Sequence, residues 1–304
     1  MPACESQVLK FLAWCALRGV QSLDQYLSHV RTGLQQHGFP TDALYGKVFP
    51  TFLRSTRRWQ KEQGLIKPRP ARLPFTLEML QSSLTLLDLE SITDLRLLTC
   101  LAVGLFGLMR AGEFSISEHG EPFNVHLHVT RANCIVGSSV ATIYLPASKT
   151  DRYGKGTTIT LARVPGSKTC PHCLLQLWLH NTSHTSNPQD HLFALHGKPY
   201  MKKAFASEFR ALVKNLHKDP AHYTPHSLRI GGATLAALAG LSAAVIMDLG
   251  RWSSDCYLRY IKLDANKRAE LARTLAEVSL RCKIDHSALA EEHLATWGSQ
   301  IIRP

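Results

Sequence analysis

Thr224-Pro225-His226-Ser227-Leu228-Arg229, which continues as Ile230-Gly231-Gly232-Ala233, is the segment that decides the fold of this chain. Thr224 is a good N-cap and Pro225 suits a first helical turn, so the segment predicts that a helix begins here. His226 and Arg229 are three positions apart and therefore share one face of that turn. Free backbone N–H groups, the helix dipole, an arginine and a histidine together favour a bound phosphate. The plain alternative is a helix start with two basic residues on its surface.

The composition of the whole chain indicates a soluble globular protein with a polyanionic partner. Its 304 residues are 45% hydrophobic and carry 35 Lys and Arg against 23 Asp and Glu, a net charge of +12, which favours nucleic acid or a membrane surface. No apolar run reaches the length of a membrane span, and Lys10 interrupts the run 8–17, so neither a membrane segment nor a signal peptide is expected. The eight cysteines are scattered, which predicts reduced thiols in an intracellular compartment, the nucleus if the source is eukaryotic.

The first 66 residues predict a small all-α domain. Apolar positions recur at helical spacing over 6–18, 22–37 and 43–63. Residues 67–74 hold three prolines and three basic residues, which suits an extended linker between domains. Basic residues are concentrated between 47 and 72, where Glu62 is the single acid. From this stretch come the candidates for DNA contact, which are Arg54, Arg57, Arg58, Lys61, Arg69 and Arg72.

The rest of the chain predicts a second domain that is mostly α-helical with a small antiparallel β-sheet, an α+β fold. Alternating apolar residues predict strands at 123–130, 140–146 and 157–163, and the polar hairpin loop 147–156 joins the last two. The expected helices, of which the second is apolar enough to be buried, are 76–87, 94–109, 171–180, 202–217, 226–239, 242–249 and 254–262, followed by a helical tail over 264–297.

Two weaker motifs favour other functions. Cys170-Pro-His-Cys173, with His180 and His184 near it, resembles half of a zinc site, but no second ligand pair of similar quality follows. A helix start that contains two thiols is therefore favoured, and no metal is expected. Residues 232–252 imitate a helix-turn-helix, yet their second helix has only Asp248 as a polar residue and is expected to be core rather than a recognition helix.

A dispersed set of six residues carries more information than either motif. The set is Arg110, Lys149, His226, Arg229, Trp252 and Tyr260. In order, spacing and surroundings it resembles the tyrosine recombinase (phage integrase) family over 75–265. The matching surroundings are Arg110-Ala-Gly-Glu113, Ser148-Lys-Thr150, the run from His226 to Thr234, Leu249-Gly-Arg-Trp252 and Tyr260-Ile-Lys262. The last two blocks resemble most closely the integrases of DIRS-type and Crypton-type eukaryotic mobile elements.

The resemblance implies metal-independent DNA recombination or integration without a cofactor. Tyr260 would attack a DNA phosphodiester and form a 3′-phosphotyrosyl intermediate. Arg110 and Arg229 would neutralise the charge that develops on the phosphate oxygens, because guanidiniums stay charged and bind two oxygens at once. His226 and the indole N–H of Trp252 would be further donors, with His226 also the candidate base. Lys149 would protonate the departing 5′-oxygen.

The resemblance also implies the organisation of the chain. Residues 1–66 would be a core-binding (SAM-like) domain that clamps double-stranded DNA, 67–74 a basic linker, and 75–265 the catalytic domain of a homotetramer on DNA, with no membrane partner. The tail 266–304 would dock on a neighbouring protomer, and packing onto its own domain is the alternative. Its apolar positions are Leu271, Leu275, Val278, Leu289, Leu294 and Trp297.

One spacing departs from the family pattern. The family's nucleophile follows its His or Trp by nine positions, which from Trp252 lands on Ile261, whereas Tyr260 follows by eight. Tyr257 is the rival nucleophile, and both tyrosines could instead be packed aromatics on one helix face. Two further hypotheses stay open for the protein, a catalytically inactive domesticated integrase that only binds DNA, and a zinc or helix-turn-helix regulator.

Overall fold

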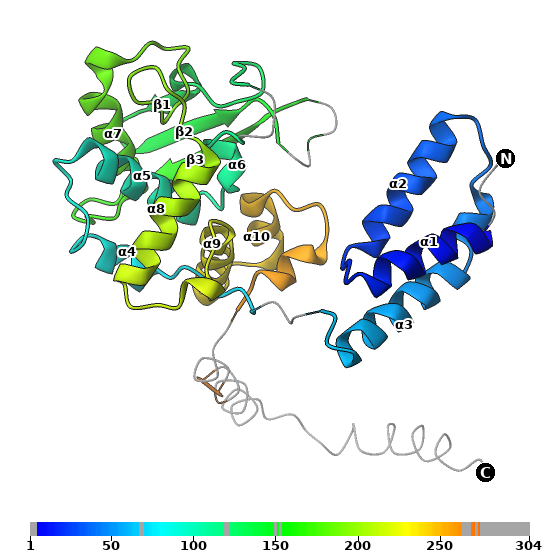
Figure 1. Ribbon diagram of the computed structural model, residues 1–304. Helices are drawn as coiled ribbons and strands as arrows, with labels where there is room; N and C mark the ends of the chain where they lie inside the picture. Colours follow the sequence, from blue (N-terminus) through cyan, green and yellow to red (C-terminus); the bar gives the residue numbers. More distant parts are fainter. Residues whose placement is uncertain are drawn as a thin grey trace, which may run out of the picture. The chain divides into compact units, whose positions relative to one another are not determined.

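The computed structural model describes residues 5–66, 70–117, 122–148, 151, 154–262, 269–270 and 273. Two compact units make up the chain, Met1–Ala71 and Arg72–Pro304, and each is described by itself (Figure 1). Within the described ranges, no helix has both the length and the apolar character that crossing a membrane requires.

Unit 1 is all-α, as the sequence predicts. Its helices are α1 (Glu5–Leu17), α2 (Leu23–Gln36), the 3-10 turn η1 (Asp42–Tyr45) and α3 (Val48–Glu62). The helix expected over 43–63 is therefore interrupted, because η1 ends at Gly46, whose backbone is extended. Leucines and Phe49 form the core between the three helices. Buried Gln60 ties α3 to the α1–α2 turn, since its amide donates to the carbonyls of Ala16 (2.8 Å) and Val20 (3.0 Å).

Unit 2 is built around helix α5 (Ile92–Phe106), of which ten residues are buried. This is the buried helix that the apolar run predicts. α4 (Leu77–Ser83) precedes it and is shorter than the predicted 76–87, because the chain continues in tight turns after Ser83. The short helix α6 (Ala111–Phe114) follows α5. Later helices are α7 (Pro171–Asn181), α8 (Lys202–Asn215), α9 (His226–Leu238) and α10 (Ala243–Gly250), with short 3-10 turns at Arg131–Asn133, Ser183–Thr185 and Pro220–His222.

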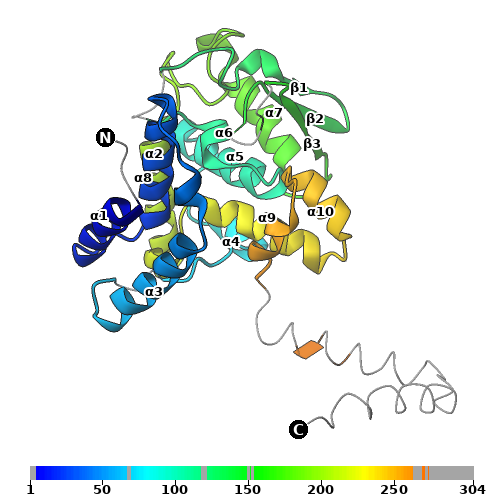
Figure 2. The same ribbon diagram turned by 90° about the vertical axis from the view of Figure 1, so that its right-hand side faces the viewer.

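A three-stranded antiparallel sheet completes unit 2, so the chain is mostly α with a small sheet, as expected. The strands β1 (Cys134–Val136), β2 (Val140–Leu145) and β3 (Thr157–Ala162) lie in that order, and Ile143 faces Ile159 across β2 and β3. Figure 2 shows the sheet beside α7. The predicted strands 140–146 and 157–163 are confirmed.

The predicted strand 123–130 is wrong. The Asn124 side chain accepts a hydrogen bond from His126 N (2.9 Å) and its carbonyl accepts one from Leu127 N (3.0 Å), so the segment turns instead of extending. Val125 and Leu127 are exposed, which removes the expected buried face. The remaining strand of the sheet is β1, which the sequence pattern did not predict because its three residues are too few to show an alternation.

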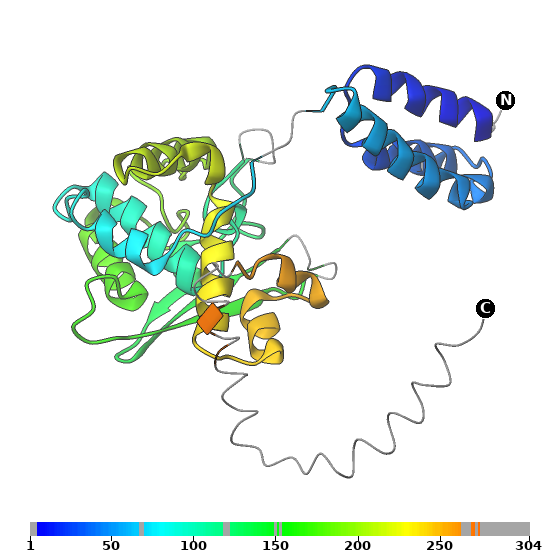
Figure 3. The ribbon, with the colours of Figure 1, turned by 90° about the horizontal axis from the view of Figure 1, so that it is seen from below.

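The end of the described chain also differs from the prediction. Residues 254–262 were expected to be helical, but the structure has a 3-10 turn η5 (Asp255–Arg259) that ends before Tyr260. A left-handed residue, Arg251, separates α10 from this turn. Figure 3 shows α9 in yellow, followed by α10 in gold. The predicted tail helix lies outside the described residues except at 269–270 and 273.

Two adjacent glycines let α9 pack against its neighbours through backbone. A Cβ on Gly231 would overlap the carbonyl oxygen of Phe75, and a Cβ on Gly232 would overlap that of Leu105 in α5. Phe75 N also donates to the carbonyl of Ser227 (2.9 Å). Helix α9, which carries Arg229, is therefore fixed beside the C-terminal end of α5, and the turn that follows α5 carries Arg110.

Candidate functional site

Arg110 lies in the turn between α5 and α6. Its backbone N–H donates to Glu113 Oε2 (2.8 Å), and its Nη1 donates to Glu113 Oε1 (2.9 Å). A glutamate at the third helical position that reaches back to the N-cap N–H is a stable way to begin a short helix. The Glu113 side chain is only 4% exposed, whereas that of Arg110 keeps 21%. Glu113 thus anchors Arg110 and leaves part of the guanidinium open to solvent.

Helix α9 begins at His226, with Pro225 rather than Thr224 as its N-cap residue. Thr224 therefore makes no side-chain cap bond to this helix, and its backbone N–H donates to the hydroxyl of Ser227 (3.1 Å). The pair three residues apart has two different environments. His226 is exposed, while Arg229 is fully buried, so the alternative of two surface basic residues is wrong for Arg229.

Arg229 is held under the site by backbone carbonyls. Its two Nη groups donate to the carbonyls of Leu108 and Gly250. Its guanidinium carbon lies 4.3 Å from the centre of the Trp252 ring, a cation–π contact. Burial, together with the charges of Arg110 and Arg251, lowers the pKa of Arg229 to about 10. The side chain is therefore still a cation at neutral pH, and it sits in surroundings that are short of negative charge.

Tyr260 stands between two other members of the predicted set. Its ring centre is 5.1 Å from that of His226 and 4.9 Å from that of Trp252, and its backbone carbonyl accepts from the Thr234 hydroxyl (3.1 Å). The tyrosine is half-buried. Tyr257, the rival nucleophile, is 8% exposed and belongs to a small core cluster with Trp252.

One pocket of about 700 Å³ collects several of these groups. Arg110, His226 and Tyr260 line it, whereas Trp252 and the buried Arg229 do not, although the Arg229 guanidinium carbon lies 5.8 Å from the centre of the Tyr260 ring. His226 keeps an exposed surface, but its partial burial at the pocket wall, and then the charges of Arg229, Arg110 and Arg72, lower its pKa below the usual value. The lowered pKa favours the neutral form of His226, which is the form that can accept a proton.

The pocket also holds residues that the sequence did not single out. Lys202, at the start of α8, and His128 line it, as does Ser148. Ser148 directly precedes Lys149, which itself lies outside the described residues. The motif pattern gave no signal for Lys202 and His128, because they come from segments with no recognisable spacing to the six residues.

The basic residues predicted to contact DNA fall into three groups. Arg54, Arg57, Arg58 and Lys61 are all exposed on α3. Two of them form ion pairs, Arg57 with Asp24 (2.6 Å) and Arg58 with Glu62 (2.9 Å). Arg72 belongs to unit 2, where it donates to the carbonyl of Ala221 (3.0 Å), and Arg69 lies outside the described residues.

The two weaker motifs find little support in the described residues. His172 contacts the carbonyl of Gly137 (2.8 Å), the thiol of Cys170 accepts from Val164 N (3.2 Å), and the described ranges contain no group of three or more His, Cys, Asp or Glu arranged for a metal. In α10, the helix expected to be core, Ile246 is buried, but Val245 and Leu249 are 44% and 40% exposed. That part of the prediction is wrong, because α10 covers the core with one face only.

No protein-family model matches this sequence, and no curated protein matches it either. Among solved structures, the Tn1549 transposon integrase in complex with a circular intermediate DNA matches with a TM-score of 0.55 at 14% identity, over 88% of this chain and 84% of that chain. XerA recombinase matches with a TM-score of 0.49 at 16% identity, over 83% and 81% of the two chains. The XerH site-specific recombinase in its post-cleavage complex has a TM-score of 0.49 at 16% identity, over 67% of this chain and 53%, about half, of that chain. The chain therefore has the fold of the Tn1549 integrase.

Proposed function

We propose that the protein is a tyrosine-type site-specific DNA recombinase, which cuts and rejoins DNA strands through a 3′-phosphotyrosyl intermediate. The observation that carries the proposal is the single pocket lined by Arg110, His226 and Tyr260, with Arg229 buried behind it. The fold shared with an integrase supports the same reading. Within that class, the blocks Leu249-Gly-Arg-Trp252 and Tyr260-Ile-Lys262 favour the integrases of DIRS-type and Crypton-type elements.

The two arginines suit the charge that the reaction develops. Attack on a phosphodiester increases the negative charge on its non-bridging oxygens, and cations fixed in advance lower that barrier. Arg110 is the accessible member, since part of its side chain is open to the pocket. Arg229 is fully buried, so its charge would act on the phosphate through protein rather than through water, where the attraction between them is stronger.

Tyr260 is the proposed nucleophile. A free phenol has a pKa of roughly 10, so attack at neutral pH needs a base or a cationic neighbourhood. His226 provides the base, because its pKa is lowered and its ring stands beside that of Tyr260. Trp252 packs under both Tyr260 and Arg229 and holds them in place, in addition to its proposed role as a donor. Lys149 remains the proposed acid for the departing 5′-oxygen, and no metal or cofactor takes part.

The remaining parts of the chain are assigned roles in DNA binding and assembly under the same proposal. We propose that residues 1–66 form a core-binding domain and that 67–74 link it to the catalytic domain, 75–265. The exposed basic residues of α3, together with Arg69 and Arg72, would contact the phosphate backbone of double-stranded DNA. The tail 266–304 would be exchanged between protomers of a tetramer.

Trapping the covalent intermediate tests the proposal. The protein is incubated in EDTA with nicked DNA from which the cleaved fragment diffuses away, so that a phosphotyrosyl adduct accumulates. The expected result is an adduct that Tyr260→Phe abolishes and Tyr257→Phe retains. An adduct with the opposite dependence would show that Tyr257 is the nucleophile. Salt-sensitive DNA binding without any adduct would instead support the inactive, DNA-binding alternative.

A further inference from the structure

Arg251 is a buried arginine that the proposed chemistry leaves without a role. It follows α10 in a left-handed conformation (φ 55°), which non-glycine residues rarely adopt, and this turns its side chain inward. The side chain is 12% exposed. One Nη donates to the carbonyls of Gly107 (3.2 Å) and Leu249 (3.3 Å), and the other to the carbonyl of Leu108 (3.2 Å) and to Glu113 Oε2 (2.8 Å).

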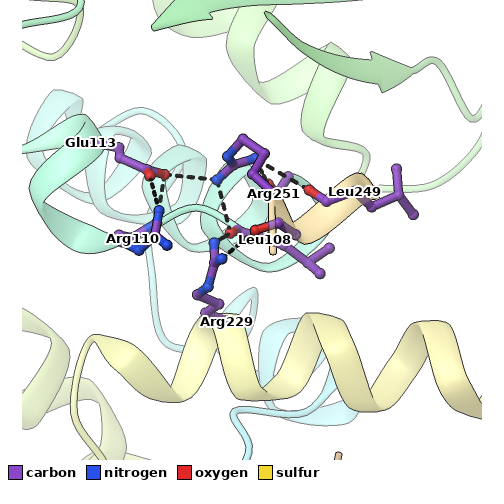
Figure 4. A network of polar contacts seen from close by, with 8 residues as sticks. Leu108, Arg110, Glu113, Arg229, Leu249 and Arg251 are labelled. Atoms are coloured by element: carbon purple, nitrogen blue, oxygen red, sulfur yellow. Dashed lines mark hydrogen bonds and ion pairs between the residues drawn. The ribbon is translucent and has the colours of Figure 1, made fainter. Parts of the chain in front are cut away.

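Two of these acceptors also hold the arginines of the site. Glu113 binds Arg110 through both carboxylate oxygens, and one of them also accepts from Arg251. The carbonyl of Leu108 accepts from both Arg251 and Arg229. Figure 4 shows the three guanidiniums gathered around these acceptors. Arg251 therefore connects Arg110, in the turn before α6, with Arg229 on α9.

We infer that Arg251 is a positioning residue for the proposed cleavage reaction, which fixes the separation of the two guanidiniums whose charges would neutralise the phosphate. This inference rests on the proposed function. Arg110 and Arg229 repel each other. The charge of Arg110 is, next to burial, the largest cause of the lowered pKa of Arg229. A shared carboxylate and a shared carbonyl, both bound by Arg251, hold the two cations together before a phosphate arrives.

The local turn that carries Arg251 supports this role. Gly250 makes the turn possible, because a Cβ there would overlap the Trp252 ring. The same turn supplies the carbonyl of Gly250 to Arg229 and that of Leu249 to Arg251. The segment Leu249-Gly-Arg-Trp252 thus supplies carbonyl acceptors to Arg229 and Arg251 and an aromatic ring to Arg229.

The test compares Arg251→Gln with a matched variant, Arg96→Gln. Arg96 is also 12% exposed and is also paired with a glutamate, Glu208 (3.4 Å), but that glutamate is not the one that binds Arg110 and Arg251. We expect Arg251→Gln to slow single-turnover adduct formation about 100-fold, because a small displacement of a catalytic group costs about that much. DNA affinity should change by about twofold or less, since the other phosphate contacts remain. Arg96→Gln should cleave at the wild-type rate, and Arg251→Lys, which keeps a charge for Glu113, should fall between wild type and Arg251→Gln.

A second substrate distinguishes positioning from a purely structural role. A methylphosphonate at the scissile position lacks the charged oxygen that the arginines neutralise. The penalty for Arg251→Gln should therefore shrink on that substrate to about tenfold or less. The inference is overturned if Arg251→Gln cleaves like wild type, if Arg96→Gln slows cleavage as much, or if the penalty is equal on both substrates. If the wild-type protein forms no adduct, the proposed function fails instead. The arginine side-chain NMR signals then decide the inference: Arg251→Gln must shift those of Arg110 and Arg229 but not that of Arg96.

Discussion

The backbone contact between α9 and α5 predicts the effect of Gly232→Ala. The added Cβ would lie well inside the 3.0 Å that real Cβ atoms keep from other atoms, and the atom it meets is the carbonyl oxygen of Leu105, which cannot rotate away. Relief therefore requires the two helices to separate by about 1 Å, a change of the kind that overpacking forces on a dense core.

The magnitude follows from two opposing effects. Overpacking costs about 1–3 kcal/mol, and alanine in a helix interior returns up to about 1 kcal/mol relative to glycine. The net loss of unfolding free energy should be about 1–2 kcal/mol. Separation would also weaken the bond from Arg229 to the carbonyl of Leu108, so adduct formation should fall even where the variant is fully folded.

Urea unfolding followed by circular dichroism measures the loss, and hydrogen exchange of α5 assigns the transition to unit 2. Gly33→Ala is the control, because Gly33 is a helical glycine of α2 with nothing within 4 Å of an added Cβ. That variant should gain about 0.5–1 kcal/mol. A Gly232→Ala protein as stable as Gly33→Ala would refute the close backbone approach of α9 and α5.

Three further outcomes are expected. Arg229→Lys should lose about 1–3 kcal/mol of unfolding free energy, because a lysine cannot keep both carbonyl bonds and the Trp252 stacking, and an unchanged urea midpoint would contradict this. His226 has a folded pKa below its unfolded value of about 6.5, so its contribution to stability is complete above that pH and is lost as the pH falls through the folded pKa. The stability of wild type relative to His226→Gln should therefore decline as the pH falls below about 6.5, and a difference that stays constant would contradict the lowered pKa. Replacing four basic residues of α3 by glutamine, namely Arg54, Arg57, Arg58 and Lys61, should weaken binding to all DNA sequences. The slope of log K against log salt concentration should become shallower by about 2–4, below the value for four free charges because Asp24 and Glu62 already pair with two of the residues. An unchanged slope would mean that this face of α3 is only solvated.

The sequence predicted most helices of this fold because each buries one apolar face that recurs at helical spacing. The buried run of α5 and the two longer strands were confirmed for the same reason. The prediction was wrong at 123–130 because side-chain hydrogen bonds of Asn124 outweigh the alternation of Val125, Leu127 and Val129. A short local bond of this kind leaves no periodic trace in a sequence.

The candidate site was predictable in part. Arg110, His226, Trp252 and Tyr260 could be picked out because their spacing follows a known pattern, and the structure brings their elements together. Arg251 was not picked out, although it stands nine positions before Tyr260, because its contacts depend on a left-handed turn and on two acceptors more than 130 positions earlier in the chain. Its neighbour Trp252 was picked out because tryptophan is one of the residue types of the family pattern, whereas an arginine is common on any basic protein surface.

The balance of charge around Glu113 has a consequence for the protein when no ligand is bound. Arg110 and Arg251 form ion pairs with this one carboxylate, and Arg229 shares the carbonyl of Leu108 with Arg251, so the cluster of three guanidiniums and one carboxylate has two positive charges in excess. A phosphodiester brings one negative charge, and the transition state of its cleavage approaches two. Under the proposed function, the transition state of cleavage would therefore neutralise the cluster. By linkage, an anion that binds this cluster only in the folded state must also stabilise the fold of unit 2.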